Sequence, residues 1–279
     1  MAVLRCRGRW FTSFKFGDNH VESYHADSFI LNRNIEELNS SYIINPSINT
    51  NDRKTRLVYP IPMKAIRTIA LKSSLMNYDL GKIYGELYLN YMLASTLVKD
   101  TTPAYYYLSS KNNDIASNSI DIDRLFLEYP FVKELINHAL ESIESDAKFK
   151  LHGRFTAGSI FLNTESFQPF VINVPTRFLG PLEYDLACLL QNVLERIMES
   201  QKLKQDYTNL SEFYVAFLSV IQERYTIGKE LLICCMVYCY VGHINYFQFV
   251  QNKYGRRMLS YQEVARDVSR FISVIRDHK

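Results

Sequence analysis

The segment from Leu151 to Ile160, "LHGRFTAGSI", has the spacing of a loop that performs phosphoryl transfer. Such a loop needs an Asp two residues after its His, to accept the proton of the attacking hydroxyl, and an Asn five residues later, to hold a magnesium ion. Here His152 is followed by Arg154 at the Asp position and by Ser159 at the Asn position. The spacing of the loop is therefore present, but both working side chains are replaced.

These replacements change the chemistry that the loop can perform. An arginine cannot act as a general base, because its pKa stays above about 12 and it remains protonated. Its guanidinium would repel a metal ion, but it can hold a phosphate, a carboxylate or an acidic side chain through a bidentate contact. A serine can still bind a metal weakly or hydrogen-bond a ligand. We therefore expect Arg154 and Ser159 to bind an anionic ligand.

A β-hairpin is predicted directly after this loop. Two apolar runs, Ile160–Leu162 and Phe170–Val174, flank the polar stretch "NTESFQP", a pattern typical of two strands joined by a turn. In loops of this arrangement the following strand ends in a second metal-binding Asp. The corresponding residue is most naturally Asn173, which keeps the shape of an Asp but lacks the charge that holds a hard cation. We expect Asn173 to contribute to the same ligand-binding site.

An amphipathic helix is predicted after a Gly-Pro turn in "LGPLEYDLACLL", residues 179 to 190. Its apolar residues recur at helical spacing, and they are Leu186, Leu189, Leu190, Val193, Leu194 and Ile197. Asp185 lies near the start of this helix, and we expect it to cap or brace the helix that it begins. Glu165, Glu183 and Asp185 are the first acidic residues after the loop, so they are the candidates for replacing its missing acids.

Together, the loop, the hairpin and the helix resemble the motifs of the aminoglycoside phosphotransferases and choline kinases, a family of protein-kinase-like enzymes. In that family the loop usually reads His-Gly-Asp, four residues and Asn. A strand with Ile-Asp near its end follows, and then a Gly-Asp-Pro turn and a Tyr-Asp-Leu-Ala helix. The residues of this pattern that the sequence keeps are His152, Gly153, Gly158, Ile172, Gly180, Pro181, Tyr184, Asp185, Leu186 and Ala187. It departs from the pattern at Arg154, Ser159 and Asn173, and the motif-bearing resemblance covers about residues 150 to 200.

The resemblance implies a two-lobed, protein-kinase-like fold of the α+β class, with a small β-rich N-terminal lobe and a larger, mainly helical C-terminal lobe. We place the first lobe at residues 1–62 and the second at 63–279, with the remnant of the catalytic loop and its hairpin at 151–174. The residues that we expect to maintain the structure of the motif are Gly153, Gly158, Tyr184 and Asp185.

The first 62 residues favour β-strands. "RWFTSFKF" and "VESYHADSFIL" predict two strands joined by a turn at Gly17–His20, and "TRLVYPIP" predicts a further strand ended by its prolines. The likeness to kinases is weak in this region. A phosphate-covering loop would need several glycines, and only Gly8 and Gly17 are available, while the second strand carries no lysine for the phosphates of ATP.

From residue 78 onwards the chain is predicted to be mostly helical. The stretch 78–98 places apolar residues on one face, with Asp79 as its expected cap. The polar stretch 105–123 predicts a loop. Further helices are predicted at about residues 129–147, 183–200, 209–225, 229–252 and 260–276.

Composition and length exclude some classes of protein. The 279 residues, 47% of them apolar, suffice for one large domain or two modest lobes. A net charge of +3 with 22% charged residues is too balanced for a nucleic-acid-binding protein or a polybasic membrane-surface protein. The run from Leu231 to Val250 is about long enough to span a bilayer, but it contains His243, Asn245 and Gln248. We favour a buried helix over a membrane span, because the centre of a helical lobe needs a helix that is apolar all round.

The five cysteines are Cys6, Cys188, Cys234, Cys235 and Cys239. Their odd number and their clustering in an apolar run argue against a disulfide framework. Cys235 and Cys239 are spaced like metal ligands on a helix, and only His243 lies near enough in the sequence to extend the set. Buried free thiols are the favoured interpretation. Reduced thiols and the lack of a signal peptide predict a cytoplasmic protein.

Three interpretations of function follow from these observations. The favoured one is a non-catalytic pseudokinase that binds an anionic ligand, or a partner protein or peptide, in the cleft between the lobes, with no cofactor. Losing a general base alone typically slows catalysis about a hundredfold to ten-thousandfold. The alternative is an active, ATP- and magnesium-dependent kinase with a rearranged site, acting on a small hydroxylated molecule or a peptide. A third possibility is a helical interaction protein without kinase ancestry, which a structure lacking the N-terminal sheet would favour.

Overall fold

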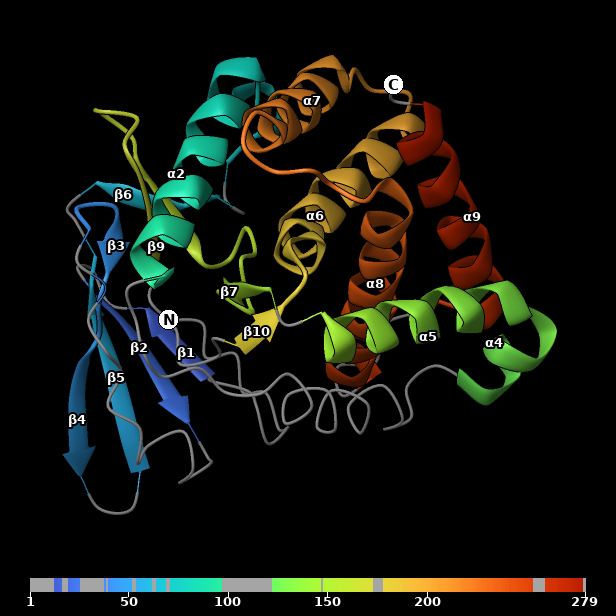
Figure 1. The fold of residues 1–279 in the computed structure, drawn as a ribbon, viewed down its shortest axis with the longest axis horizontal. Coiled ribbons are helices and arrows are strands. Elements are labelled where there is room, and N and C mark those ends of the chain that lie inside the picture. Colours follow the sequence, from blue (N-terminus) through green and yellow to red (C-terminus); the bar gives the residue numbers. More distant parts are fainter. Residues whose placement is uncertain are drawn as a thin grey trace.

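The computed structural model describes residues 13–16, 20–25, 38, 40–51, 54–61, 64–68, 71–96, 122–146, 148–172, 178–252 and 259–277. Strands gather in the N-terminal part of the chain, at one end of the molecule, and helices make up most of the C-terminal part (Figure 1). Helix α9 lies at the end opposite the N-terminal sheet. This is the mixed α+β arrangement that the sequence predicted.

The first sheet is antiparallel and has the strand order β1-β2-β5-β4. Its strands are β1 (Ser13–Phe16), β2 (His20–His25), β4 (Ser47–Asn51) and β5 (Lys54–Pro60). Phe14 pairs with Ser23, which confirms the predicted pair of strands, although most of the predicted turn between them lies outside the described residues. Along β5, Leu57 and Tyr59 are buried and their neighbours are less so, as expected for a strand with one face on a core.

The second sheet contains the hairpin predicted after the loop. Its strands are β3 (Ile43–Ile44), β6 (Ala65–Arg67), β8 (Ile160–Asn163) and β9 (Pro169–Ile172), in the order β3-β9-β8-β6. A cluster of buried side chains connects this sheet to the first, and it comprises Ile44, Leu57, Tyr59, Phe161 and Ile172. Strands on both sides of the lobe boundary predicted near residue 62 pair with the β8–β9 hairpin, and that boundary stays a prediction.

Two short strands frame the loop itself. Strand β7 (Phe149–Leu151) precedes it, and β10 (Phe178–Gly180) precedes the helix that carries the Tyr-Asp-Leu-Ala motif. The two strands pair antiparallel, with Leu151 opposite Phe178. This pairing brings the start of the loop next to the start of that helix, although the two are about thirty residues apart in the sequence.

The helices lie close to their predicted positions. They are α2 (Tyr78–Thr96), α4 (Ile122–Glu128), α5 (Pro130–Ser145), α6 (Leu182–Lys202), α7 (Thr208–Gln222), α8 (Lys229–Asn252) and α9 (Tyr261–Asp277), with a short 3-10 turn, η2 (Ser73–Leu75), before α2. Two predictions need correction. Asn77, not Asp79, caps α2, because the Asn77 Oδ1 accepts a hydrogen bond from the Leu80 N–H at 3.1 Å. Helix α4 was missed, because a single seven-residue helix carries too few turns to show a periodic pattern.

Helices α2 and α7 pack closely side by side (Figure 1). Two glycines of α2 allow this approach. A Cβ atom added at Gly81 would lie 2.5 Å from the Phe213 carbonyl oxygen, and one added at Gly85 would lie 2.7 Å from the Cβ of Val220. Because no other residue is small enough for this spacing, the glycines set the distance between the two helices.

Helix α8 is buried among other helices, as predicted. It packs on α5, α6 and α9, and nine of its residues have less than a tenth of their surface exposed: Leu232, Ile233, Cys234, Cys235, Met236, Val237, Tyr238, Tyr240 and Val241. Across the described segments, no helix combines the length and apolar character that a bilayer crossing requires.

Candidate functional site

Asp185 of α6 holds the loop between β7 and β8 through hydrogen bonds to the loop backbone. The His152 N–H donates to one carboxylate oxygen of Asp185 at 2.6 Å, and the Gly153 N–H donates to the other at 2.9 Å. The Tyr88 hydroxyl of α2 adds a longer contact of 3.4 Å. Asp185 is completely buried, so this clamp forms away from bulk water, where such hydrogen bonds are strong. The sequence predicted that Asp185 braces its own helix, whereas its carboxylate braces the loop.

His152 joins the loop to the hairpin. Its Nδ1 accepts a hydrogen bond from the Arg154 N–H at 3.1 Å, so the ring hydrogen resides on Nε2, which donates to the Ile172 carbonyl oxygen at 2.8 Å. The ring is buried and packs edge-on against Tyr91 and Phe155, with centroid distances of 5.1 and 5.9 Å. The histidine is therefore a structural member of the site that ties β9 to the loop.

Gly153 adopts a backbone conformation that favours glycine. Its φ angle is +74°, in the left-handed region where a Cβ atom would crowd the following carbonyl. This turn directs the N–H groups of residues 152 and 153 towards the two oxygens of Asp185. The His-Gly pair thus has a geometric reason: the first residue binds β9, and the second permits the turn.

Arg154, at the position of the expected proton acceptor, is half-buried and follows this clamp directly. Its carbonyl oxygen accepts hydrogen bonds from the Thr156 N–H at 2.8 Å and from the Ser159 hydroxyl at 2.7 Å. The Ser159 hydroxyl lies 3.2 Å from the Thr156 hydroxyl as well. These contacts close the loop on itself, and the ligand-binding role expected of Ser159 stays a prediction.

Arg67 of β6 is part of this site, although the sequence did not predict it. Its Nε and Nη2 both donate to the Gly158 carbonyl oxygen, at 3.1 and 2.9 Å. A Cβ atom at Gly158 would lie 2.8 Å from the Arg67 Nη2, so the glycine makes room for this guanidinium. The only signal in the sequence is a single charge within the otherwise apolar and small stretch "AIRTIA".

The two arginines influence each other electrostatically. Burial lowers the pKa of Arg67 to about 10, and the positive charge of Arg154 contributes to this decrease. At neutral pH Arg67 is nevertheless protonated, because its pKa lies well above 7. The site therefore carries two positively charged side chains, Arg154 from the loop and Arg67 from β6.

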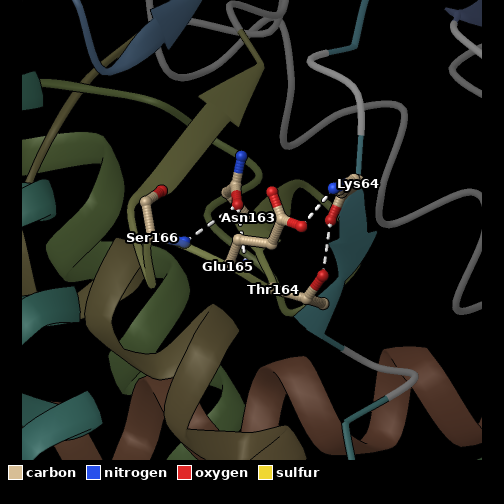
Figure 2. A network of polar contacts seen from close by, with 5 residues as sticks. All are labelled: Lys64, Asn163, Thr164, Glu165 and Ser166. Carbon is tan, nitrogen blue, oxygen red and sulfur yellow. Dashed lines mark hydrogen bonds and ion pairs between the residues drawn. The ribbon is translucent and has the colours of Figure 1, made fainter.

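The three acidic residues considered as replacements are all engaged elsewhere. Glu165 lies in the exposed turn of the β8–β9 hairpin, where it forms an ion pair with Lys64 (Figure 2). In the same turn, the Asn163 side-chain oxygen accepts hydrogen bonds from the N–H groups of Glu165 and Ser166. Glu183 accepts a hydrogen bond from the Gly228 N–H at 2.7 Å. With Asp185 clamping the loop, each of the three carboxylates has a structural partner.

Two further predicted residues, Tyr184 and Asn173, remain to be placed. Tyr184 is buried, and its ring packs against Phe178 and Tyr238 at centroid distances of 5.2 and 6.4 Å. Asn173 lies outside the described residues, so its place relative to Arg154 is a prediction.

The four cysteines that the structure describes are not arranged as a metal site. Cys188, Cys234 and Cys235 are buried and Cys239 is partly buried, and none of these four is in a disulfide bond, while Cys6 lies outside the described residues. Burial raises the pKa of Cys234 to about 11, which keeps this thiol protonated. Within the segments that the structure describes, no group of three His, Cys, Asp or Glu side chains is positioned to hold a metal ion.

Solved structures with the same architecture are known. An aminoglycoside-3'-phosphotransferase of type VIII superposes with a TM-score of 0.54 and 14% sequence identity, over 82% of this chain and 88% of the other. The chain has the aminoglycoside phosphotransferase and choline kinase fold. A choline/ethanolamine kinase family protein from Mesorhizobium loti matches with a TM-score of 0.53 and 9% identity, over 99% of this chain and 88% of the other. No protein-family model and no curated protein sequence matches.

This likeness confirms the predicted fold class and the resemblance drawn from the motifs. A structure without the N-terminal sheet would have favoured the third interpretation, a helical protein without kinase ancestry, and that sheet is present. At such low identity the likeness concerns the fold alone. Catalysis and ligand binding have to be argued from the residues of this chain.

Proposed function

We propose that this chain is a non-catalytic protein with a phosphotransferase fold, and that it binds an anionic ligand at Arg154. The ligand would be an anionic small molecule or an acidic segment of a partner protein or peptide. The proposal rests on one observation: Asp185 clamps the loop through the backbone of His152 and Gly153, and the side chain that follows this clamp is an arginine.

The charge of the loop supports this function over phosphoryl transfer. Phosphoryl transfer needs a proton acceptor and metal-binding acids beside the transferred group. Arg154 can provide neither, and Arg67, which donates to the Gly158 carbonyl oxygen, adds a second positive charge. Two guanidinium groups repel a divalent cation and attract an anion. The local electrostatics are therefore opposite to those that magnesium binding requires.

Isothermal titration of the full chain tests the proposal. We expect ATP to show no magnesium-dependent binding, and inorganic phosphate to bind the wild type and to lose affinity at least about tenfold in Arg154→Gln. Arg270→Gln is the matched control, because Arg270 is an exposed arginine of α9 and its loss changes the net charge equally. Tight binding of ATP only when magnesium is present would contradict the proposal.

An active kinase with a rearranged site is the competing function. The three nearby acids are held by Lys64, by the Gly228 N–H and by the loop backbone, so this function would need a different acid. Its test is the transfer of radiolabelled phosphate from ATP to a panel of hydroxylated small molecules and peptides. Labelling of any substrate by purified protein would support the kinase and refute the non-catalytic function.

A further inference from the structure

We propose that Cys188 and Cys239 form a site of reversible oxidation, at which a disulfide bond links α6 to α8. Their sulfur atoms lie 3.8 Å apart, although the two residues are 51 positions apart in the sequence. The oxidant would be a small disulfide such as oxidised glutathione. The inference goes beyond the proposed function, and neither depends on the other.

The contact between the two thiols comes from the packing of two long helices. Cys188 belongs to the first turns of α6 and Cys239 to the middle of α8, and the two helices pack against each other (Figure 1). The sulfur atoms of a disulfide are about 2.05 Å apart, so these two must approach by about 1.8 Å. Rotation about the two Cα–Cβ bonds moves both sulfur atoms. We therefore expect the bond to form by motion of the side chains, with the helices still packed.

The two thiols differ in exposure, and this sets the order of the reaction. Cys239 is partly exposed, whereas only 6% of Cys188 is exposed. The seam between the helices opens further towards solvent at Glu195 and His243, whose side chains are 25% and 35% exposed and are joined by a hydrogen bond of 3.1 Å. His243 lies one turn beyond Cys239 on the same face of α8. A small disulfide therefore reaches Cys239 first.

The chemistry is a thiol–disulfide exchange in two steps. The Cys239 thiol gives its proton to water, and its sulfur attacks one sulfur of the small disulfide, which forms a mixed disulfide and releases one thiolate. The Cys188 thiol then loses its proton, attacks the Cys239 sulfur and releases the second thiolate. The two thiolates take up the two protons. The protein thus gives up two electrons and two protons, and the small disulfide is reduced to two thiols.

The neighbouring cysteines of α8 are poor competitors in this reaction. Cys235 is completely buried, and burial, together with the charge of Glu183, raises its pKa well above the ordinary value. Burial also raises the pKa of Cys234 to about 11. The thiolate is the attacking form, so both residues stay unreactive near neutral pH. Because Cys234 is a buried cysteine of the same helix, Cys234→Ala is the matched control for substitutions of the reactive pair.

The test is oxidation of the full folded chain with oxidised glutathione. The remaining thiols are then blocked with N-ethylmaleimide, and peptide mass spectrometry identifies the residues that are linked. We expect Cys188 and Cys239 to be joined, and dithiothreitol to restore both thiols. Cys234→Ala should form the link at the wild-type rate within about twofold, whereas Cys188→Ala and Cys239→Ala should not form it.

The two cysteine variants also test the order of attack. Cys188→Ala keeps the more exposed thiol, and the reaction should stop at a glutathione adduct on Cys239. Cys239→Ala keeps the buried thiol, which should acquire an adduct at least about tenfold more slowly. An adduct that forms as fast on Cys188 as on Cys239 would overturn the order proposed here.

Thermal unfolding shows whether the link fits the folded packing. A disulfide stabilises mainly by restricting the unfolded chain, and the effect grows with the length of the loop that it closes. We expect oxidation to raise the Tm of the wild type by about 5–10 °C and to leave the Tm of Cys239→Ala unchanged. Three results would overturn the inference: a link that forms only in urea, a link between a different pair of cysteines, or a Tm that stays the same or falls on oxidation.

Discussion

Replacing Asp185 tests whether its carboxylate holds the loop. In Asp185→Ala two buried N–H groups, of His152 and Gly153, lose their acceptors, which lie at 2.6 and 2.9 Å in the wild type. Each unpaired buried donor costs about 1–3 kcal/mol, so we expect a loss of about 2–6 kcal/mol in the free energy of unfolding. Asp185→Asn keeps the shape but retains only one acceptor oxygen, so its loss should be about half as large.

Urea unfolding followed by far-ultraviolet circular dichroism measures these losses, and hydrogen exchange localises them. The amides of residues 152 and 153 should both exchange faster in Asp185→Ala than in the wild type, and at least one of them should do so in Asp185→Asn. Glu183→Gln is the matched control, because Glu183 is also a buried acid near the start of α6, but it accepts one hydrogen bond, from Gly228. The control keeps an acceptor and should leave exchange at residues 152 and 153 unchanged.

A buried carboxylate also carries a desolvation cost, which its removal would relieve. If that cost exceeded the hydrogen bonds, Asp185→Asn would be as stable as the wild type or more stable. We expect the hydrogen bonds to dominate, because both oxygens are satisfied by backbone donors at short distances. Unchanged stability of Asp185→Asn, together with unchanged exchange at Gly153, would refute the clamp.

Three further substitutions probe the rest of the fold. Gly85→Ala brings a methyl group within 2.7 Å of the Val220 Cβ on α7 and should lower the free energy of unfolding in urea by about 1–3 kcal/mol. Gly242→Ala is the control, because a methyl group there would meet nothing within 4 Å, and it should be neutral or stabilising. Equal losses in the two variants would refute close α2–α7 packing. Gly153→Ala places a side chain at a φ of +74° and should cost about 1–2 kcal/mol, and a smaller loss would show that the turn relaxes. Asp206→Ala should lower Tm at pH 7, because hydrogen bonds from Thr208 lower the pKa of Asp206. That contribution is lost as the pH falls through the folded pKa, so the Tm gap should narrow as the pH falls below the ordinary pKa of an Asp, and a gap that does not change with pH would contradict it.

The parts of the fold that the sequence predicts are those encoded by local patterns. The turn residues of the hairpin and the apolar spacing of α6 to α9 each lie within one short stretch, and those elements are found as predicted. Arg67 was missed because its partner, Gly158, is 91 residues away, and no local sequence pattern predicts such a contact. The cap of α2 was misassigned because Asn77 and Asp79 are both good capping residues, and only the backbone decides between them.

The division between kept and replaced residues follows a physical rule. Asp185 and His152 match the family pattern, and each binds backbone groups: Asp185 the N–H groups of residues 152 and 153, and His152 the chain at residues 154 and 172. The positions that depart from the pattern are Arg154, Ser159 and Asn173, where the resemblance implies proton-accepting or metal-binding side chains. A clamp made to the backbone does not depend on the side chain at position 154, so the loop can keep its shape while an arginine replaces the acid. Under the proposed function the fold persists without the chemistry, and the positive charge at Arg154 attracts the ligand.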